Sequence, residues 1–236
     1  MSKRTWFVLV VFAVAVGWPA YRFYVEIDKA SSEDPLVWEA DIRALERRAE
    51  GQFPAHTAVV FVGSSSIRLW DSLAKDMAPV PVIRQGFGGA KLNDVVHYAE
   101  RLVSVHRPRA VVVFAGTNDI QPGRSKSPAA LLAAYQTLVR TVRREQPELP
   151  VYFIAITPSP MRWAVWDVAL ETNRLITKYS AGDRNLHVID TGPALLGADG
   201  KPERANYVFD GLHLSAQGYA IWTSIIRPPL LAELGL

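Results

Sequence analysis

A run of three serines and an Asp-x-x-His pair are the residues whose types and spacing could perform chemistry. The serines, residues 64–66, follow a glycine at the end of a short apolar run, and the pair is Asp210 and His213. A carboxylate three residues before a histidine on a tight turn can accept a hydrogen bond from Nδ1–H and leave Nε2 free as a base. Because a serine hydroxyl needs such a base to become a nucleophile, the two motifs together could carry out acyl transfer.

Two further polar turns follow apolar runs that are typical of strands. They are Gly86-Phe87-Gly88-Gly89 and Gly116-Thr117-Asn118-Asp119. In a parallel sheet the carboxyl ends of the strands lie at one edge, which is where open α/β sheets bind their ligands. We therefore expect these turns and the serine turn to converge on one crevice.

Each of these motifs also has a plainer interpretation. The serines could cap a helix, as serines commonly do where a strand turns into a helix, and Asn118 could do the same. The glycine turn could be no more than a tight turn. It is not a dinucleotide-binding fingerprint, because the last glycine of that pattern would fall at Lys91. His213 could be a structural histidine, so the residues alone leave these alternatives open.

The elements that must position these motifs follow from the hydrophobic pattern. Short apolar runs predict strands at residues 58–62, 80–83, 110–115, 151–156 and 186–189. Longer patterned segments predict helices at residues 36–50, 92–106, 128–146, 166–179 and 215–226. Strands that alternate with helices require a parallel sheet covered on both faces, and about five units are too few for an eight-fold barrel. We predict an α/β fold: a three-layer α/β/α sandwich with a five-stranded, mostly parallel sheet.

The N-terminus differs from the rest of the chain. Lys3 and Arg4 precede an uncharged run from Trp6 to Trp18, which predicts an export signal. We expect residues 1–26 to be an uncleaved signal anchor or a cleaved signal peptide, residues 27–35 a polar tether, and residues 36–236 the globular domain. The domain would then lie outside the cytoplasm, in the periplasm or the extracellular space, anchored in the membrane or secreted if the signal is cleaved.

Composition excludes several classes of protein. The chain of 236 residues has no cysteine, so thiol catalysis, disulfides and cysteine-ligated zinc are ruled out. Its five histidines are scattered and predict no metal cluster. The net charge of +3 is spread without a dense basic run, so we expect no nucleic-acid partner. We expect membrane contact only through the N-terminal segment.

Together, the four motifs resemble those of the SGNH/GDSL hydrolase superfamily, over roughly residues 59–222. The resemblance implies a flavodoxin-like fold of SGNH hydrolase type, with residues 36–236 as the catalytic domain. It also implies Ser65 as nucleophile, Asp210 and His213 as its triad partners, and Gly89 and Asn118 in the oxyanion hole. The sequence departs from the family at residue 64, where the family's aspartate is replaced by serine; that aspartate is not a triad member.

The resemblance implies a serine esterase or acylhydrolase that cleaves short-chain acyl esters through an acyl-enzyme. The amides of Ser65 and Gly89 and the side-chain amide of Asn118 could stabilise the oxyanion, and this chemistry requires no cofactor. The substrate would be a small-molecule or carbohydrate acyl ester. Two alternatives are a carbohydrate O-deacetylase of the same mechanism and a catalytically silent carbohydrate-binding module of the cell envelope.

The loop after the fourth predicted strand is expected at the same sheet edge. It is rich in proline, and Trp163 and Trp166 are bulky enough to wall off an acyl pocket. The alternative is that both tryptophans pack under the following helix, because tryptophan is usually largely buried.

Overall fold

The computed structural model describes residues 28–236. The predicted signal at residues 1–26 lies outside the described residues. Within the described part of the chain, no helix combines the length and the apolar character needed to cross a membrane.

A single sheet of five parallel strands forms the centre of the molecule, in the order β2-β1-β3-β4-β5. The strands are β1 (Val59–Gly63), β2 (Val82–Gly86), β3 (Ala110–Phe114), β4 (Val151–Ile154) and β5 (Leu186–Ile189). The predicted α/β fold with a five-stranded sheet is therefore confirmed. Gly63 lies in register with Gly86 on one side and with Phe114 on the other, so the turns after β1, β2 and β3 begin at the same level of the sheet.

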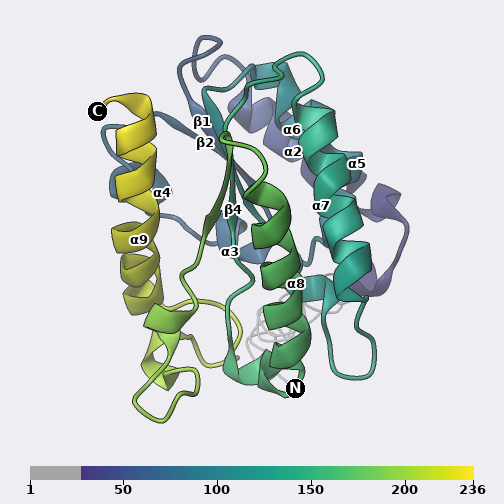
Figure 1. The fold of residues 1–236 in the computed structure, drawn as a ribbon. Helices are drawn as coiled ribbons and strands as arrows, with labels where there is room; N and C mark the ends of the chain where they lie inside the picture. Colours follow the sequence, from purple (N-terminus) through teal and green to yellow (C-terminus); the bar gives the residue numbers. More distant parts are fainter. Residues whose placement is uncertain (1–27) are drawn as a thin grey trace, which may run out of the picture.

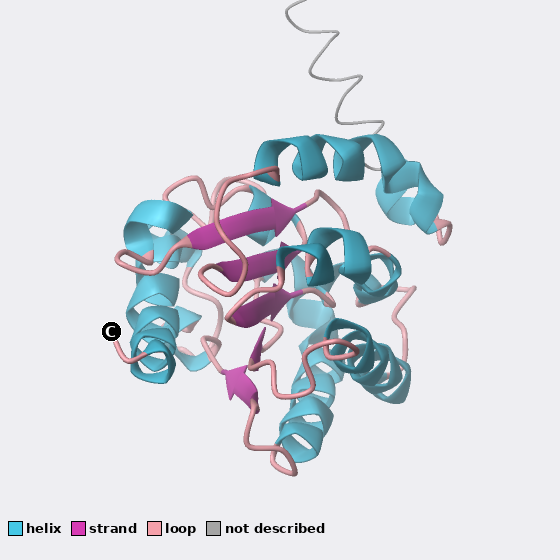
Figure 2. Cartoon of the chain, turned by 90° about the horizontal axis from the view of Figure 1, so that it is seen from above, coloured by secondary structure: helices cyan, strands magenta, loops and turns pink. Residues whose placement is uncertain are grey.

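Helices cover both faces of this sheet, as Figures 1 and 2 show. One face packs against α2 (Glu39–Ala49), α5 (Leu92–His97), α6 (Ala99–Leu102), α7 (Pro128–Val142) and α8 (Trp166–Ser180). The other packs against α3 (Ser65–Arg68), α4 (Leu73–Asp76) and α9 (Ala216–Leu234). Short 3-10 turns complete the chain at Pro35–Trp38 (η1), Ser104–His106 (η2), Thr117–Asp119 (η3), Pro160–Val165 (η4), Pro193–Leu195 (η5) and Arg204–Asn206 (η6).

The alternation of side chains along the strands divides the core into two layers. In β1, Val60 and Val62 belong to the layer under α2 and α7, whereas Val59 and Phe61 belong to the layer under α9. All of β1 is buried. This explains why the strand is a continuous apolar run rather than an alternating one.

Two helices differ from the prediction. The helix expected at residues 92–106 is divided into α5, α6 and η2, with Tyr98 outside helical geometry (φ −100°, ψ 8°). The last helix continues past the predicted end at residue 226, through Pro228 and Pro229, to Leu234. Leu230 and Leu234 are buried in this added part, so packing on the sheet stabilises the helix despite its prolines.

The polar segment expected to be a tether does not behave as one within the described residues. Residues 28–31 are helical, and polar contacts from residues 29 and 31–33 join the segment to the domain. Lys29 pairs with Asp41 of α2 (2.7 Å), and Arg124 donates to the carbonyl of Ser31 (3.2 Å). The physical reason is that the charges of this segment find partners on the domain instead of remaining in water. We call residues 28–34 the N-terminal strap.

Candidate active site

Ser65 is the first residue of α3, directly after β1. At the turn between β1 and α3 the backbone lies very close to the end of β3. A Cβ on Gly63 would lie 2.0 Å from the Phe114 carbonyl oxygen, and Gly63 has a φ of +149°. Glycine is therefore required at this turn. The three adjacent serines are all buried, but only the hydroxyl of Ser65 lies within hydrogen-bond distance of a histidine.

The loop before α9 brings Asp210 and His213 to this serine. The Nδ1 of His213 lies 2.6 Å from Oδ2 of Asp210, and Nε2 lies 2.8 Å from Oγ of Ser65. The other carboxylate oxygen of Asp210 accepts from the backbone N–H groups of Leu212 (2.8 Å) and His213 (3.0 Å). The three side chains thus form one hydrogen-bonded chain.

These contacts set the ionisation of Asp210. Partial burial raises the pKa of this carboxyl, but the hydrogen bonds from the His213 side chain and from two backbone N–H groups outweigh burial and hold the pKa of Asp210 below its usual value. Asp210 is therefore a carboxylate throughout the neutral range, as is needed to orient an imidazole and to stabilise imidazolium.

The other two predicted residues lie on turns that are joined to each other. Gly89 follows β2 with a φ of +72°, in a segment that we call the glycine loop (residues 86–91). Asn118 lies on η3, after β3, and its Nδ2 donates to the carbonyl of Ala90 (2.9 Å). An amide group has two N–H donors, so Asn118 can hold the glycine loop and still offer one donor to a ligand.

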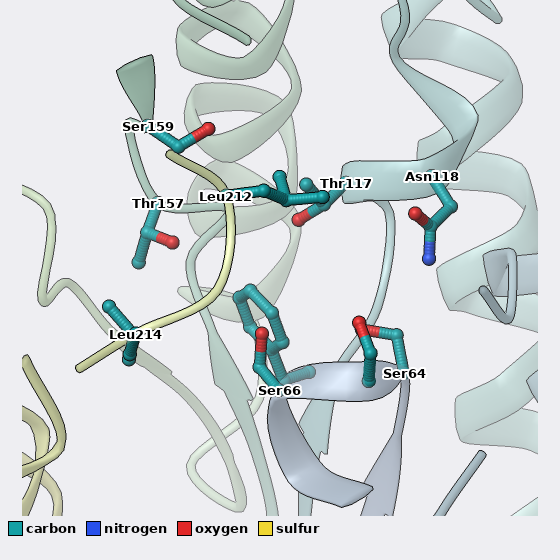
Figure 3. A pocket seen from close by; sticks show the side chains of 10 residues that line it. Ser64, Ser66, Thr117, Asn118, Thr157, Ser159, Leu212 and Leu214 are labelled. Atoms are coloured by element: carbon teal, nitrogen blue, oxygen red, sulfur yellow. The ribbon is translucent and has the colours of Figure 1, made fainter. Parts of the chain in front are cut away.

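A small cavity of about 10 Å³ lies beside Ser65. It is lined by Ser64, Ser65, Ser66, Phe114, Thr117, Asn118, Thr157, Ser159, Leu212 and Leu214, most of which carry a hydroxyl or an amide. Figure 3 shows Asn118 directed from its turn toward the serine turn, with Thr157 and Ser159 across the cavity on another segment. The side-chain oxygens of Thr117 and Ser159 are buried without a hydrogen-bond partner.

Trp163 and Trp166 do not line this cavity. They stack on each other, with ring centroids 6.2 Å apart and planes at 16°, and Trp166 lines a separate groove with Leu170 and Pro193. The reason is the 3-10 turn η4, which carries both rings to the start of α8. The same loop contributes Thr157 and Ser159 instead.

Sequence reasoning missed these two hydroxyl residues, although a signal was present. They directly follow a predicted strand, and so they occupy the same sheet edge as the other turns. The loop is also tied to the Asp-His loop, because the Met161 N–H donates to the Gly211 carbonyl (2.9 Å) and the Tyr207 hydroxyl donates to the Pro158 carbonyl (2.6 Å).

Residues 52–221 match the GDSL-like lipase/acylhydrolase family. This match covers more than half of the chain, and the chain belongs to that family. The family acts on esters, so the protein is a hydrolase of the esterase kind. A comparison with curated protein sequences gives no match.

Solved structures with a similar fold include other esterases. A GDSL-like lipase from Bacteroides thetaiotaomicron has a TM-score of 0.66 at 17% identity, with 86% of this chain and 98% of that chain covered. A carbohydrate esterase of family 3 from Talaromyces cellulolyticus has a TM-score of 0.60 at 17% identity, covering 75% and 97%. The lipase/acylhydrolase from Enterococcus faecalis has a TM-score of 0.58 at 22% identity, covering 73% and 94%. At these identities the similarity is one of fold.

Proposed function

We propose that the protein is a serine esterase that cleaves short-chain acyl esters through an acyl-enzyme. The observation that carries the proposal is the hydrogen-bonded chain from Asp210 through His213 to Ser65, with the two distances of 2.6 and 2.8 Å. Membership of the acylhydrolase family supports the same reaction class.

In the proposed mechanism, Ser65 Oγ attacks the ester carbonyl carbon while His213 Nε2 takes the hydroxyl proton. The carbonyl oxygen becomes an oxyanion, which the amides of Ser65 and Gly89 and the side chain of Asn118 stabilise. The C–O bond to the alcohol then breaks, and His213 returns the proton to the leaving oxygen. Water attacks the acyl-enzyme by the same route, with His213 as base, and releases the acid.

The size of the cavity beside Ser65 supports a small acyl group. A volume of about 10 Å³ has room for a group no larger than about one water molecule. Each added methylene should then cost about 1–3 kcal/mol of transition-state binding. We therefore expect acetyl esters to react faster than butyryl or longer esters.

A second candidate is a carbohydrate O-deacetylase with the same mechanism. The polar lining of the cavity favours it, since Thr117 and Ser159 present unpartnered hydroxyl oxygens close to the nucleophile. Comparing the hydrolysis of acetylated sugars with that of simple acetyl esters distinguishes the two substrates.

The proposal is tested by replacing each serine of the turn. Ser65→Ala should reduce hydrolysis of p-nitrophenyl acetate by about 10⁴–10⁶-fold. Ser64→Ala and Ser66→Ala, the matched controls, should keep most of the activity. A fluorophosphonate probe should label the wild type but not Ser65→Ala. An active Ser65→Ala protein would contradict the assignment, and an unlabelled, inactive wild type would favour a silent binding module.

A further inference from the structure

The N-terminal strap lies directly against the glycine loop. A Cβ placed on Gly89 would lie 2.7 Å from the Cβ of Ala30 and 3.2 Å from the ring of Trp38. Residues 28–51 lie outside the segment that matches the family, which begins at residue 52. The contact is therefore supplied by residues N-terminal to the segment that matches the family.

Charged groups link the strap to both predicted oxyanion turns. Lys91, at the end of the glycine loop, is 2% exposed; its ammonium donates to the carbonyl of Ser32 and lies 3.7 Å from Glu33. The other oxygen of Glu33 lies 3.1 Å from Lys126, which in turn lies 3.0 Å from Asp119. Positive and negative groups alternate along this chain of charges, so each ammonium has a carboxylate beside it.

The far end of the chain of charges returns to the glycine loop. Asp119 is the neighbour of Asn118, and its second oxygen accepts from the N–H of Leu92 (2.8 Å), directly after the loop. Asp119 is buried, and a buried carboxylate needs a partner to remain charged. Without Glu33, Lys91 and Lys126 would lose the carboxylate that lies between them. The glycine loop and the turn that carries Asn118 would then lose the ion pairs that connect them through the strap.

We propose that Glu33 is a positioning residue that, with Ala30 and Ser32 of the strap, holds Gly89 and Asn118 in the geometry that stabilises the oxyanion. This inference rests on the proposed function of Gly89 and Asn118. Glu33 does not touch the substrate; it acts through Lys91 and Lys126. A carboxylate with 61% of its side chain exposed contributes little to global stability as an ordinary surface ion pair. A positioning role is therefore expected to change kcat while the melting temperature stays nearly constant.

The test compares Glu33→Ala and Glu33→Gln with Glu171→Ala in the full chain. Glu171 is a suitable control because it is an exposed carboxylate paired with Arg174 (2.7 Å) on α8. Glu33→Ala should lower kcat for p-nitrophenyl acetate about tenfold, a fraction of the 10²–10³ that the loss of a whole oxyanion donor costs. KM and the melting temperature should stay close to those of the control. Glu33→Gln, which keeps a side-chain oxygen to place next to Lys126 but loses the charge, should recover part of kcat.

Hydrogen exchange gives a readout that does not depend on activity. The peptide covering residues 86–92 should exchange faster in Glu33→Ala than in Glu171→Ala, because the Leu92 N–H reports the position of Asp119. If the wild type is active and Glu33→Ala matches Glu171→Ala in kcat and in hydrogen exchange, the inference is wrong and the proposed function stands. If the wild type neither hydrolyses esters nor reacts with a fluorophosphonate, the proposed function is wrong. The positioning role of Glu33, which depends on that function, is then wrong as well. Should Glu33→Ala fail to fold, Glu33→Gln carries the same comparison.

Discussion

The imidazole of His213 is held at both ring nitrogens, by Asp210 on one side and Ser65 on the other. Asp210 is itself fixed by two backbone N–H groups of its own loop. These contacts restrict the orientation of the imidazole and of the carboxylate, and they support the proposed roles of His213 as base and Asp210 as its orienting group. It also determines how the site should respond to pH.

On the acid side of the activity profile, Asp210 should contribute no ionisation step above about pH 4, because a carboxyl whose folded pKa is lowered stays charged until the pH falls below its ordinary value of about 3.9. The lowered pKa also means that the charged form of Asp210 stabilises the folded state. This stabilisation is present above about pH 3.9 and is lost only as the pH falls through the lowered pKa. The profile of kcat/KM between about pH 4 and 9 measures this. A loss of activity above about pH 5 that requires more than one proton would contradict this prediction.

Asp210→Asn should lower kcat about 10⁴-fold.

Gly89→Ala should destabilise the protein by more than its backbone conformation explains. Gly123 is the matched control, because its φ of +76° is close to the +72° of Gly89 but no atom lies within 4 Å of its added Cβ. Gly123→Ala should cost roughly 1–2 kcal/mol of backbone strain. Gly89→Ala should cost about 1–3 kcal/mol more, from overpacking against Ala30.

Urea unfolding of both variants checks this difference. The double variant Gly89→Ala with Ala30→Gly should return most of the excess, since the collision is removed and the strained φ remains. Equal costs for the two single variants would mean that the strap does not pack on Gly89.

At the scale of elements, the strands and the turns after them follow from short-range patterns. Buried strands such as β1 and β3 are continuous apolar runs, and glycine or polar residues mark where each run ends. Because the strands are parallel, the turns share an edge, which is why the positions of Ser65 and Asn118 could be predicted before any contact was known.

Elements that depend on distant contacts could not be predicted in this way. Tyr98 interrupts the helix after the glycine loop; it packs edge-on against Phe87, and its hydroxyl donates to the carbonyl of Pro35 (3.1 Å). The strap is polar in sequence and is fixed by ion pairs, by hydrogen bonds to its carbonyl groups and by the contact of Ala30 with Gly89. Periodicity records neither contact, since each joins residues far apart in the chain.

The extension of α9 beyond its prolines gives a prediction at this scale. Leu230→Ala should cost about 2–5 kcal/mol, because Leu230 is completely buried in the layer between α9 and the sheet. Leu236→Ala, at a residue 57% exposed, should cost almost nothing. Thermal or urea unfolding compares them. A small cost at Leu230 would mean that the segment after Pro229 is not part of the core.

At the scale of the whole molecule, we propose that the domain lies outside the cytoplasm. The proposal rests on Lys3 and Arg4 ahead of the uncharged run from Trp6 to Trp18, since positive charges favour the cytoplasmic side. A phosphatase reporter fused after Leu236 should be active, because such a reporter requires export. Replacing Lys3 and Arg4 with glutamate should reduce that activity, and a reporter active only in the cytoplasm would refute the proposal.

The bond between His213 and Ser65 joins residues 148 positions apart in the chain. Closing so long a loop costs entropy that grows only slowly with its length, but folds built on such distant pairings form slowly. The proposed nucleophile is therefore synthesised 148 residues before its proposed base. A nascent chain that ends before His213 lacks that base, so the proposed activity is withheld until synthesis has passed residue 213 and the two residues have folded together.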